Sequence, residues 1–185
     1  MPLNTPSVTR NNISFGPGVL YIGASGDTPT VDLGAISEDG ISVEISSEKR
    51  TITQGNPKMP DLIYCQAQSA IVTVSGIEWN FDNFLYGLGA GTTTVSASEE
   101  TFTFGGEPAV DEVAIHIQHQ MGYAVGTTMN LYIWRAASEA GFTMPFSHDE
   151  HTFEYKWSAL RSTTNWASVA LASGAQLFHA QRQLT

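Results

Sequence analysis

Histidine and acidic residues gather in one short segment of the chain, His148-Asp149-Glu150-His151. Imidazole and carboxylate groups are common protein ligands of zinc and other transition metals. Such sites normally take further ligands from distant parts of the chain, and no further ligand can be identified here. We therefore interpret the segment as a solvated loop and expect no metal site.

A second pair of histidines, His116 and His119, lies in a segment with strand-like alternation. Side chains three positions apart on a strand point to opposite faces, so these two imidazoles cannot bind one ion. The single cysteine, Cys65, excludes an intrachain disulfide and fits assembly in a reducing cytoplasm. Its neighbours Tyr64 and Gln66 supply no activating base, so we expect a buried or half-buried structural thiol rather than a nucleophile.

Acidic residues occur in adjacent pairs, an arrangement that would suit general acid–base chemistry. Each pair adjoins a glycine, a proline or a strand edge, where carboxylates commonly solvate turns, and nothing in the sequence selects two of them as a catalytic pair. The chain also lacks a nucleophile elbow and a phosphate-binding loop. We expect no catalytic residue, no cofactor and no enzymatic activity. The pairs are Glu38-Asp39, Glu99-Glu100, Asp111-Glu112 and Asp149-Glu150.

The overall charge restricts the partners of the protein. Its 185 residues suit one domain, only 14% of them are charged, and 18 acidic against 8 basic residues give a net charge of −10. Such acidity opposes tight binding to nucleic-acid phosphates, although an acidic wall suits a conduit that DNA must not adhere to. The low charge content is typical of chains that bury surface against other subunits. We identify no signal peptide and no membrane-spanning segment.

The elements that must position these residues are mostly strands. Apolar and polar residues alternate over residues 41–46, 112–120, 129–136 and 152–160, as in half-buried strands, and residues 70–77 are rich in Val, Ile and Thr. One helix is predicted over residues 80–88, with Asn80 as its N-cap and apolar residues spaced for one buried face. The pattern predicts an antiparallel β-sandwich or barrel with one flanking helix.

Three segments fall outside this pattern. Residues 1–12 are polar with two prolines and are expected to form a flexible arm that precedes a single domain over residues 13–185. Residues 48–69 are expected to form a long hairpin or loop, which in compact domains is usually functional. Over residues 166–182 we expect a hairpin that turns at Ser173-Gly174, with a short helix as the alternative.

Four ordered features resemble the major tail tube proteins of long non-contractile-tailed bacteriophages. In chain order, the features are the start of an early strand, a link into the first long strand, a strand that leads into the helix, and a penultimate strand that ends in Ala-Leu. Together they cover most of residues 13–161. They are residues 15–23 (FGPGVLYIG), 31–36 with 40–45 (VDLGAI, GISVEI), 71–75 with 84–89 (IVTVS, FLYGLG) and 153–160 (FEYKWSAL).

The resemblance implies a subunit that forms hexameric rings around a closed inner β-barrel, a fold also found in type VI secretion tube proteins. The rings would stack into a tube within the virion, after assembly in the host cytoplasm. Expected partners are further copies of the chain, a tape-measure protein, and tail-tip or terminator proteins. Viral DNA would pass through the lumen without specific binding, and no membrane is involved.

Two groups of residues are candidates for these roles. If Ile41, Val43 and Ile45 pack inward, alternation places Ser42, Glu44 and Ser46 on the opposite face, and Glu154 likewise points outward from its strand. We expect these four outward residues to face the lumen; the alternative is an ordinary solvated face. We expect the 48–69 segment to form the contact between rings, with its cations facing an acidic neighbour. The candidate residues for this contact are Lys49, Arg50, Gln54, Asn56 and Lys58.

Other functions remain open at this point. A tail terminator, a baseplate subunit or a capsid-decoration protein would share the sandwich fold but would form discrete rings or sit on another protein. A carbohydrate-binding β-sandwich is suggested by the four tryptophans. Their plausible core positions argue against it, and so does the lack of a signal peptide; the tryptophans are Trp79, Trp134, Trp157 and Trp166.

Overall fold

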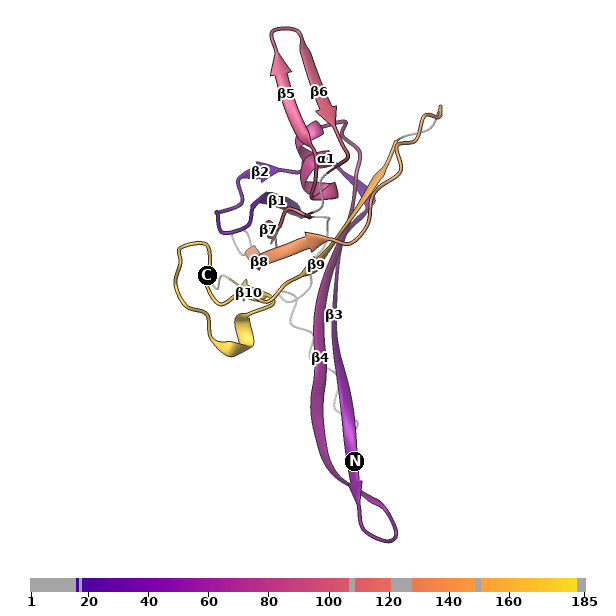
Figure 1. Ribbon diagram of the computed structural model, residues 1–185, viewed down its shortest axis with the longest axis vertical. Coiled ribbons are helices and arrows are strands. Elements are labelled where there is room, and N and C mark those ends of the chain that lie inside the picture. Colours follow the sequence, from indigo (N-terminus) through magenta and orange to yellow (C-terminus); the bar gives the residue numbers. More distant parts are fainter. Residues whose placement is uncertain (1–15, 17, 107–108, 121–127, 149–150, 183–185) are drawn as a thin grey trace, which may run out of the picture.

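The structure is a computed structural model that describes residues 16, 18–106, 109–120, 128–148 and 151–182. The N-terminal segment expected to be flexible, residues 1–12, lies outside this range. Strands dominate these residues (Figure 1). In chain order the elements are β1 (Val19–Ala24), β2 (Val31–Asp32), β3 (Ile36–Gln54), β4 (Met59–Gly76), α1 (Phe81–Leu88), β5 (Thr92–Ser96), β6 (Glu99–Thr103), β7 (Val113–Gln120), β8 (Thr128–Ser138), β9 (Phe153–Ala159), the 3-10 turn η2 (Ser173–Ala175) and β10 (His179–Arg182).

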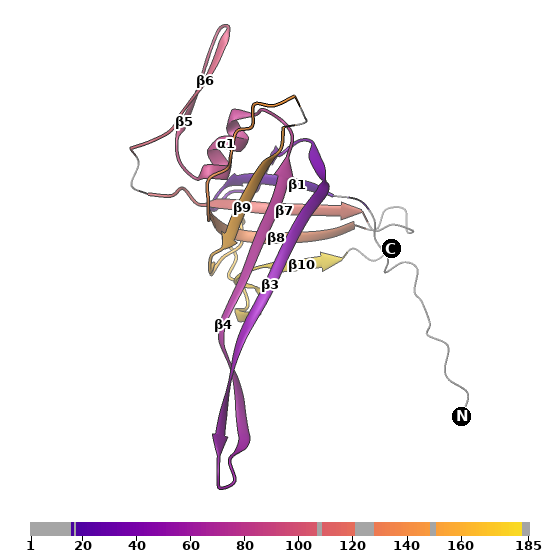
Figure 2. The ribbon, with the colours of Figure 1, turned by 90° about the vertical axis from the view of Figure 1, so that its right-hand side faces the viewer.

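Eight strands form one antiparallel sheet, and β8 is its branching point. The sheet follows the order β2-β1-β7-β8-β9-β4-β3, and β10 pairs with β8 as well. The first half of β8 pairs with β10, whereas its last residues, Ala136–Ser138, pair with β9. In Figure 2, β1, β7, β8 and β10 run across the molecule, while β3, β4 and β9 run steeply along it. The predicted mainly β, antiparallel fold with one helix is therefore confirmed.

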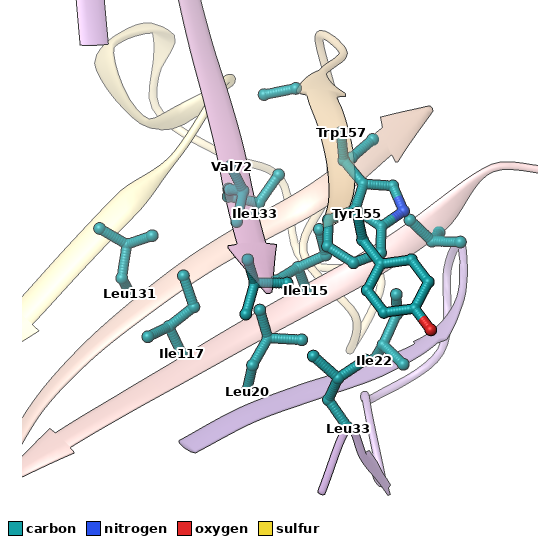
Figure 3. Packing of buried hydrophobic residues seen from close by; sticks show 14 of the residues in the cluster. Leu20, Ile22, Leu33, Val72, Ile115, Ile117, Leu131, Ile133, Tyr155 and Trp157 are labelled. Atoms are coloured by element: carbon teal, nitrogen blue, oxygen red, sulfur yellow. The ribbon is translucent and has the colours of Figure 1, made fainter. Parts of the chain in front are cut away.

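The hydrophobic core lies between these two sets of strands (Figure 3). Alternate residues of β1, β7 and β8 meet alternate residues of β4 and β9, as the sequence periodicity predicts. Full burial of a large apolar side chain contributes about 1.5–3 kcal/mol, so each of these residues stabilises the folded state. They include Leu20, Ile22, Val72, Val74, Ile115, Ile117, Leu131, Ile133, Tyr155 and Trp157.

The helix α1 forms where the sequence predicts it. The Asn80 side chain accepts a hydrogen bond from the backbone N–H of Asp82, and Gly89 ends the helix in the left-handed conformation that favours glycine. Phe84 is fully buried, and the indole N–H of Trp157 donates to the backbone carbonyl of Tyr86 at 3.0 Å. The helix is thus fixed against β9.

The 48–69 segment is a hairpin, and it is the end of a much longer one. β3 and β4 pair from Ile36 opposite Gly76 to Gln54 opposite Met59, with shifts of register after Ile36, Glu48 and Ile52. Residues 44–54 and 59–68 are exposed, and this part of the hairpin projects well beyond the body (Figures 1 and 2). The expectation that Ile45 packs inward is wrong: its side chain is 55% exposed, because the ribbon leaves the core at this position.

The expected C-terminal hairpin over residues 166–182 does not form. A 3-10 turn occupies Ser173–Ala175, and the following strand β10 pairs with β8, from His179 opposite Tyr132 to Arg182 opposite Met129. The free side of β8 offers backbone hydrogen bonds to a strand far away in sequence, and local periodicity cannot reveal such a partner. Within the described residues, no helix has the length and apolar character needed to cross a membrane.

Candidate functional site

The exposed part of the long hairpin, residues 45–54 and 59–68, is hereafter called the arm. Its register places Ile52 opposite Leu62 on one face and Thr51 opposite Ile63 on the other. Large apolar side chains are therefore exposed on both faces. A two-stranded hairpin is only marginally stable in water, and an exposed apolar ribbon is a common site of protein–protein contact.

All five candidates for ring-to-ring contact lie on the arm or in its turn. Lys49 and Arg50 lie partway along β3 and face opposite sides of the ribbon, opposite Cys65 and Tyr64 respectively. The remaining three, Gln54, Asn56 and Lys58, gather at the tip, and all five are exposed. The structure thus places the predicted cations on a protruding apolar element.

Hydroxyl groups and a thiol form side-chain contacts in the part of the arm nearer the body. The hydroxyl groups of Ser46 and Ser69 lie 2.8 Å apart, and the Ser47 hydroxyl lies 3.3 Å from the Cys65 thiol. The expectation of a buried or half-buried Cys65 is wrong, because the arm carries this residue away from the core. A cavity of about 410 Å³ opens beside this part of the arm, against the C-terminal segment; its lining includes Ile45, Ser47, Gln68, Leu177 and Phe178.

All four candidate lumen residues lie on one face of the β3–β4–β9 sheet. Ser42 on β3 pairs with Thr73 on β4, and Thr73 pairs on its other side with Lys156 on β9. Glu44 on β3 pairs with Ile71 on β4. Glu154 projects from the same face of β9, and both acids are exposed. Ser46 lies on the same face at the base of the arm, where its hydroxyl bonds with that of Ser69.

The sequence did not single out Lys156 and Glu139, which modify the charge of this face. The Lys156 ammonium group lies 3.0 Å from the Glu139 carboxylate. This contact raises the pKa of Lys156, and the charges of Glu44 and Glu154 raise it further. The face therefore combines three acids with one lysine and keeps a negative balance.

Glu112, a member of one of the adjacent acidic pairs, forms a structural ion pair with Arg135. Both of its carboxylate oxygens accept hydrogen bonds from the guanidinium group of Arg135, each at 2.5 Å. This bidentate contact lowers the pKa of Glu112 and raises that of Arg135. Arg135 also donates to the backbone carbonyl of Arg161, so the pair ties β8 to the segment after β9.

The histidine-rich segment shows no metal-binding arrangement in its described part, which excludes Asp149 and Glu150. His151 lies 3.3 Å from the indole nitrogen of Trp79 and 3.1 Å from the Ser147 carbonyl oxygen. Elsewhere in the described residues, no three His, Cys, Asp or Glu side chains gather closely enough to bind an ion.

The tryptophans occupy different environments. Trp157 is buried in the core, whereas Trp79 is exposed, contrary to the expected core position. The Trp79 ring packs at a tilt against Phe146 and edge to face against Phe153. Trp134 and Trp166 are half-buried and pack edge to face, with ring centres 4.8 Å apart. The Trp134 indole N–H donates to the carbonyl of Ala175, so this ring helps to hold the C-terminal segment in place.

Comparison of the chain with protein-family models and with curated proteins found no match.

Proposed function

We propose that the protein is a structural virion subunit that polymerises as stacked hexameric rings into a phage tail tube, the conduit for viral DNA during ejection. The observation that carries this proposal is the arm, a paired ribbon that exposes apolar side chains on both faces. A partner that covers these faces would remove apolar surface from water and would stabilise the ribbon.

The sheet also ends in a long edge that favours lateral association. β3 is the last strand of the sheet, and within the described residues its outer side has no partner strand over 19 positions. Such an edge is a template for pairing with another chain, and closure into a barrel removes edges altogether. Pairing of this edge with a different strand edge of the next copy would generate a ring, because a contact between two identical edges closes as a dimer.

The shape of the subunit favours stacking of these rings. The arm projects from one end of the body and the β5–β6 hairpin from the other (Figure 1). When different surfaces at opposite ends of one chain bind each other, assembly proceeds head to tail, and it continues as an open filament unless the rotation between copies closes it into a ring. Tubes and filaments arise in this way.

The acidic face of the β3–β4–β9 sheet suits the wall of a DNA channel. Six copies with a net charge of −10 each give −60 per ring. A lumen lined by Ser42, Glu44, Ser46 and Glu154 would repel DNA phosphates and would limit adhesion during passage. In this proposal the tape-measure protein occupies the same channel before ejection, and tail-tip and terminator proteins bind the ends of the tube.

Negative-stain electron microscopy of the concentrated protein, combined with light scattering over a dilution series, tests the proposal. We expect hollow filaments with a regular axial repeat and a concentration threshold. Isolated rings would instead favour a tail terminator, baseplate or capsid-decoration subunit. A strict monomer at every concentration, also after addition of tail-tip complex, would contradict assembly of the tube by this chain.

A further inference from the structure

We propose that the arm of one copy binds the β5–β6 hairpin of the copy in the next ring, with Arg50 facing Glu100. This contact rests on the proposed head-to-tail assembly and identifies the surface that receives the arm.

The β5–β6 hairpin is the second protruding element of the molecule (Figures 1 and 2). It forms its own two-stranded sheet, with Val95 opposite Glu100 and Ser96 opposite Glu99. Both glutamates lie at its tip and are exposed, and so is Val95. Near its base, Phe102 packs on Phe81 and Phe84 of the helix region, which anchors the hairpin and leaves the tip uncovered.

The two hairpins carry opposite charges. Residues 45–68, the arm with its turn, hold three basic residues, Lys49, Arg50 and Lys58, against two acids, Glu48 and Asp61, which gives a net charge of +1. Residues 92–103 hold two acids and no basic residue. Complementary charges guide association and fix the relative position of two surfaces, and like charges in the same place would oppose it.

The spacing along the two hairpins also agrees. Arg50 lies four residues before Gln54, which is paired with Met59 at the end of the arm, and Glu100 lies four residues before Phe104 at the base of the β5–β6 hairpin. At about 3.3 Å per residue, each interval is about 13 Å. Met59 is 61% and Phe104 is 64% exposed, so both intervals connect a charge with an uncovered apolar side chain.

One antiparallel overlap satisfies both contacts. The arm points away from its body, and the β5–β6 hairpin points away from its own body in the opposite direction (Figure 1). If the two lie side by side, the tip of β5–β6 reaches Arg50 when the tip of the arm reaches Phe104. The ion pair then sets the register, and the apolar contact of Met59 with Phe104 excludes water.

A reciprocal charge exchange tests this contact. We expect Arg50→Glu and Glu100→Arg each to raise the critical concentration for filament formation by about tenfold or more, since each places like charges opposite one another. The double variant R50E/E100R should return to within about threefold of the wild type, because the pair is restored with inverted sign. Light scattering gives the threshold, and the melting temperature of each monomer shows that the fold is intact.

Lys49 supplies the matched control, because it points to the opposite face of the ribbon from Arg50. The double variant K49E/E100R should remain as defective as E100R alone. If the wild type forms filaments but R50E/E100R is no better than the single variants, this contact is wrong while the tube proposal stands. If Glu100→Arg polymerises like the wild type, the contact is also wrong. If the wild type forms no filaments even after addition of tail-tip complex, both proposals fail.

Discussion

The ring of Tyr155 on β9 occupies the space that a side chain at position 87 of α1 would need. Gly87 and Tyr155 are both buried, and the Gly87 carbonyl oxygen accepts a hydrogen bond from the Ser138 hydroxyl. Burial raises the pKa of the Tyr155 phenol, so that it stays protonated. The helix can lie directly on the sheet because position 87 has no side chain.

We therefore expect Gly87→Ala to destabilise the monomer by roughly 1–3 kcal/mol, since the added methyl group displaces a fully packed aromatic ring. Thermal unfolding of the dilute monomer measures this change. Gly174→Ala is the control, because a Cβ there would meet nothing within 4 Å. Equal melting temperatures for the two variants would refute the close packing of α1 on Tyr155.

The Glu112–Arg135 pair predicts a pH dependence of stability on the acid side. Because the pKa of Glu112 is lowered in the folded state, its contribution is present at neutral pH. That contribution is lost as the pH falls below the ordinary carboxyl range and through the lowered folded-state pKa. Glu112→Gln should cost up to about 1 kcal/mol at pH 7, because the pair is partly exposed, and should cost little at pH 2–3.

Chemical denaturation at both pH values checks this prediction. Glu38→Gln is a suitable comparison, since Glu38 is exposed. A loss of stability in Glu112→Gln that is the same at pH 7 and pH 2–3 would show that the ion pair is not its cause.

The arm should contribute to assembly and not to monomer stability. Ile63 is 62% exposed on the arm, and Val169 is 58% exposed in the C-terminal segment. Replacing either by serine should change the unfolding free energy by only about 0.5 kcal/mol or less, because neither side chain is buried. Ile63→Ser should nevertheless raise the concentration threshold for filaments, whereas Val169→Ser should not. Identical scattering curves for the two variants would contradict the role of the arm.

Reversal of charge on the proposed lumen face should make assembled tubes retain DNA. The double variant E44K/E154K replaces two exposed acids beside Lys156 and creates a cationic strip. We expect DNA fragments present during assembly to sediment with these tubes at low salt and to be released at high salt. The control variant E38K/D39K undergoes the same change in charge, also at exposed positions. Equal DNA retention by both double variants would place Glu44 and Glu154 outside the channel.

The sequence by itself determined the elements whose side chains alternate between core and solvent. β7, β8 and β9 follow the predicted strands, and α1 begins after the predicted N-cap Asn80 and ends at Leu88, the end of the predicted range. These elements are recognisable because burial of one face imposes a local period on the residue types. The lack of a metal-ligand pattern and the concentration of cations in residues 48–58 are also local properties.

Only the tertiary structure decided which strands pair and how far the long hairpin extends. The long hairpin continues past Ile45 without a core to cover, so its exposed residues carry no periodic signal of their length. β10 joins β8 instead of a neighbour in sequence, and Lys156 meets Glu139 across β9 and the end of β8. The opposite placement of the two hairpins follows in the same way from the folding of the whole sheet. Each of these relationships joins residues far apart in the chain, whereas periodicity and turn chemistry report only on neighbours.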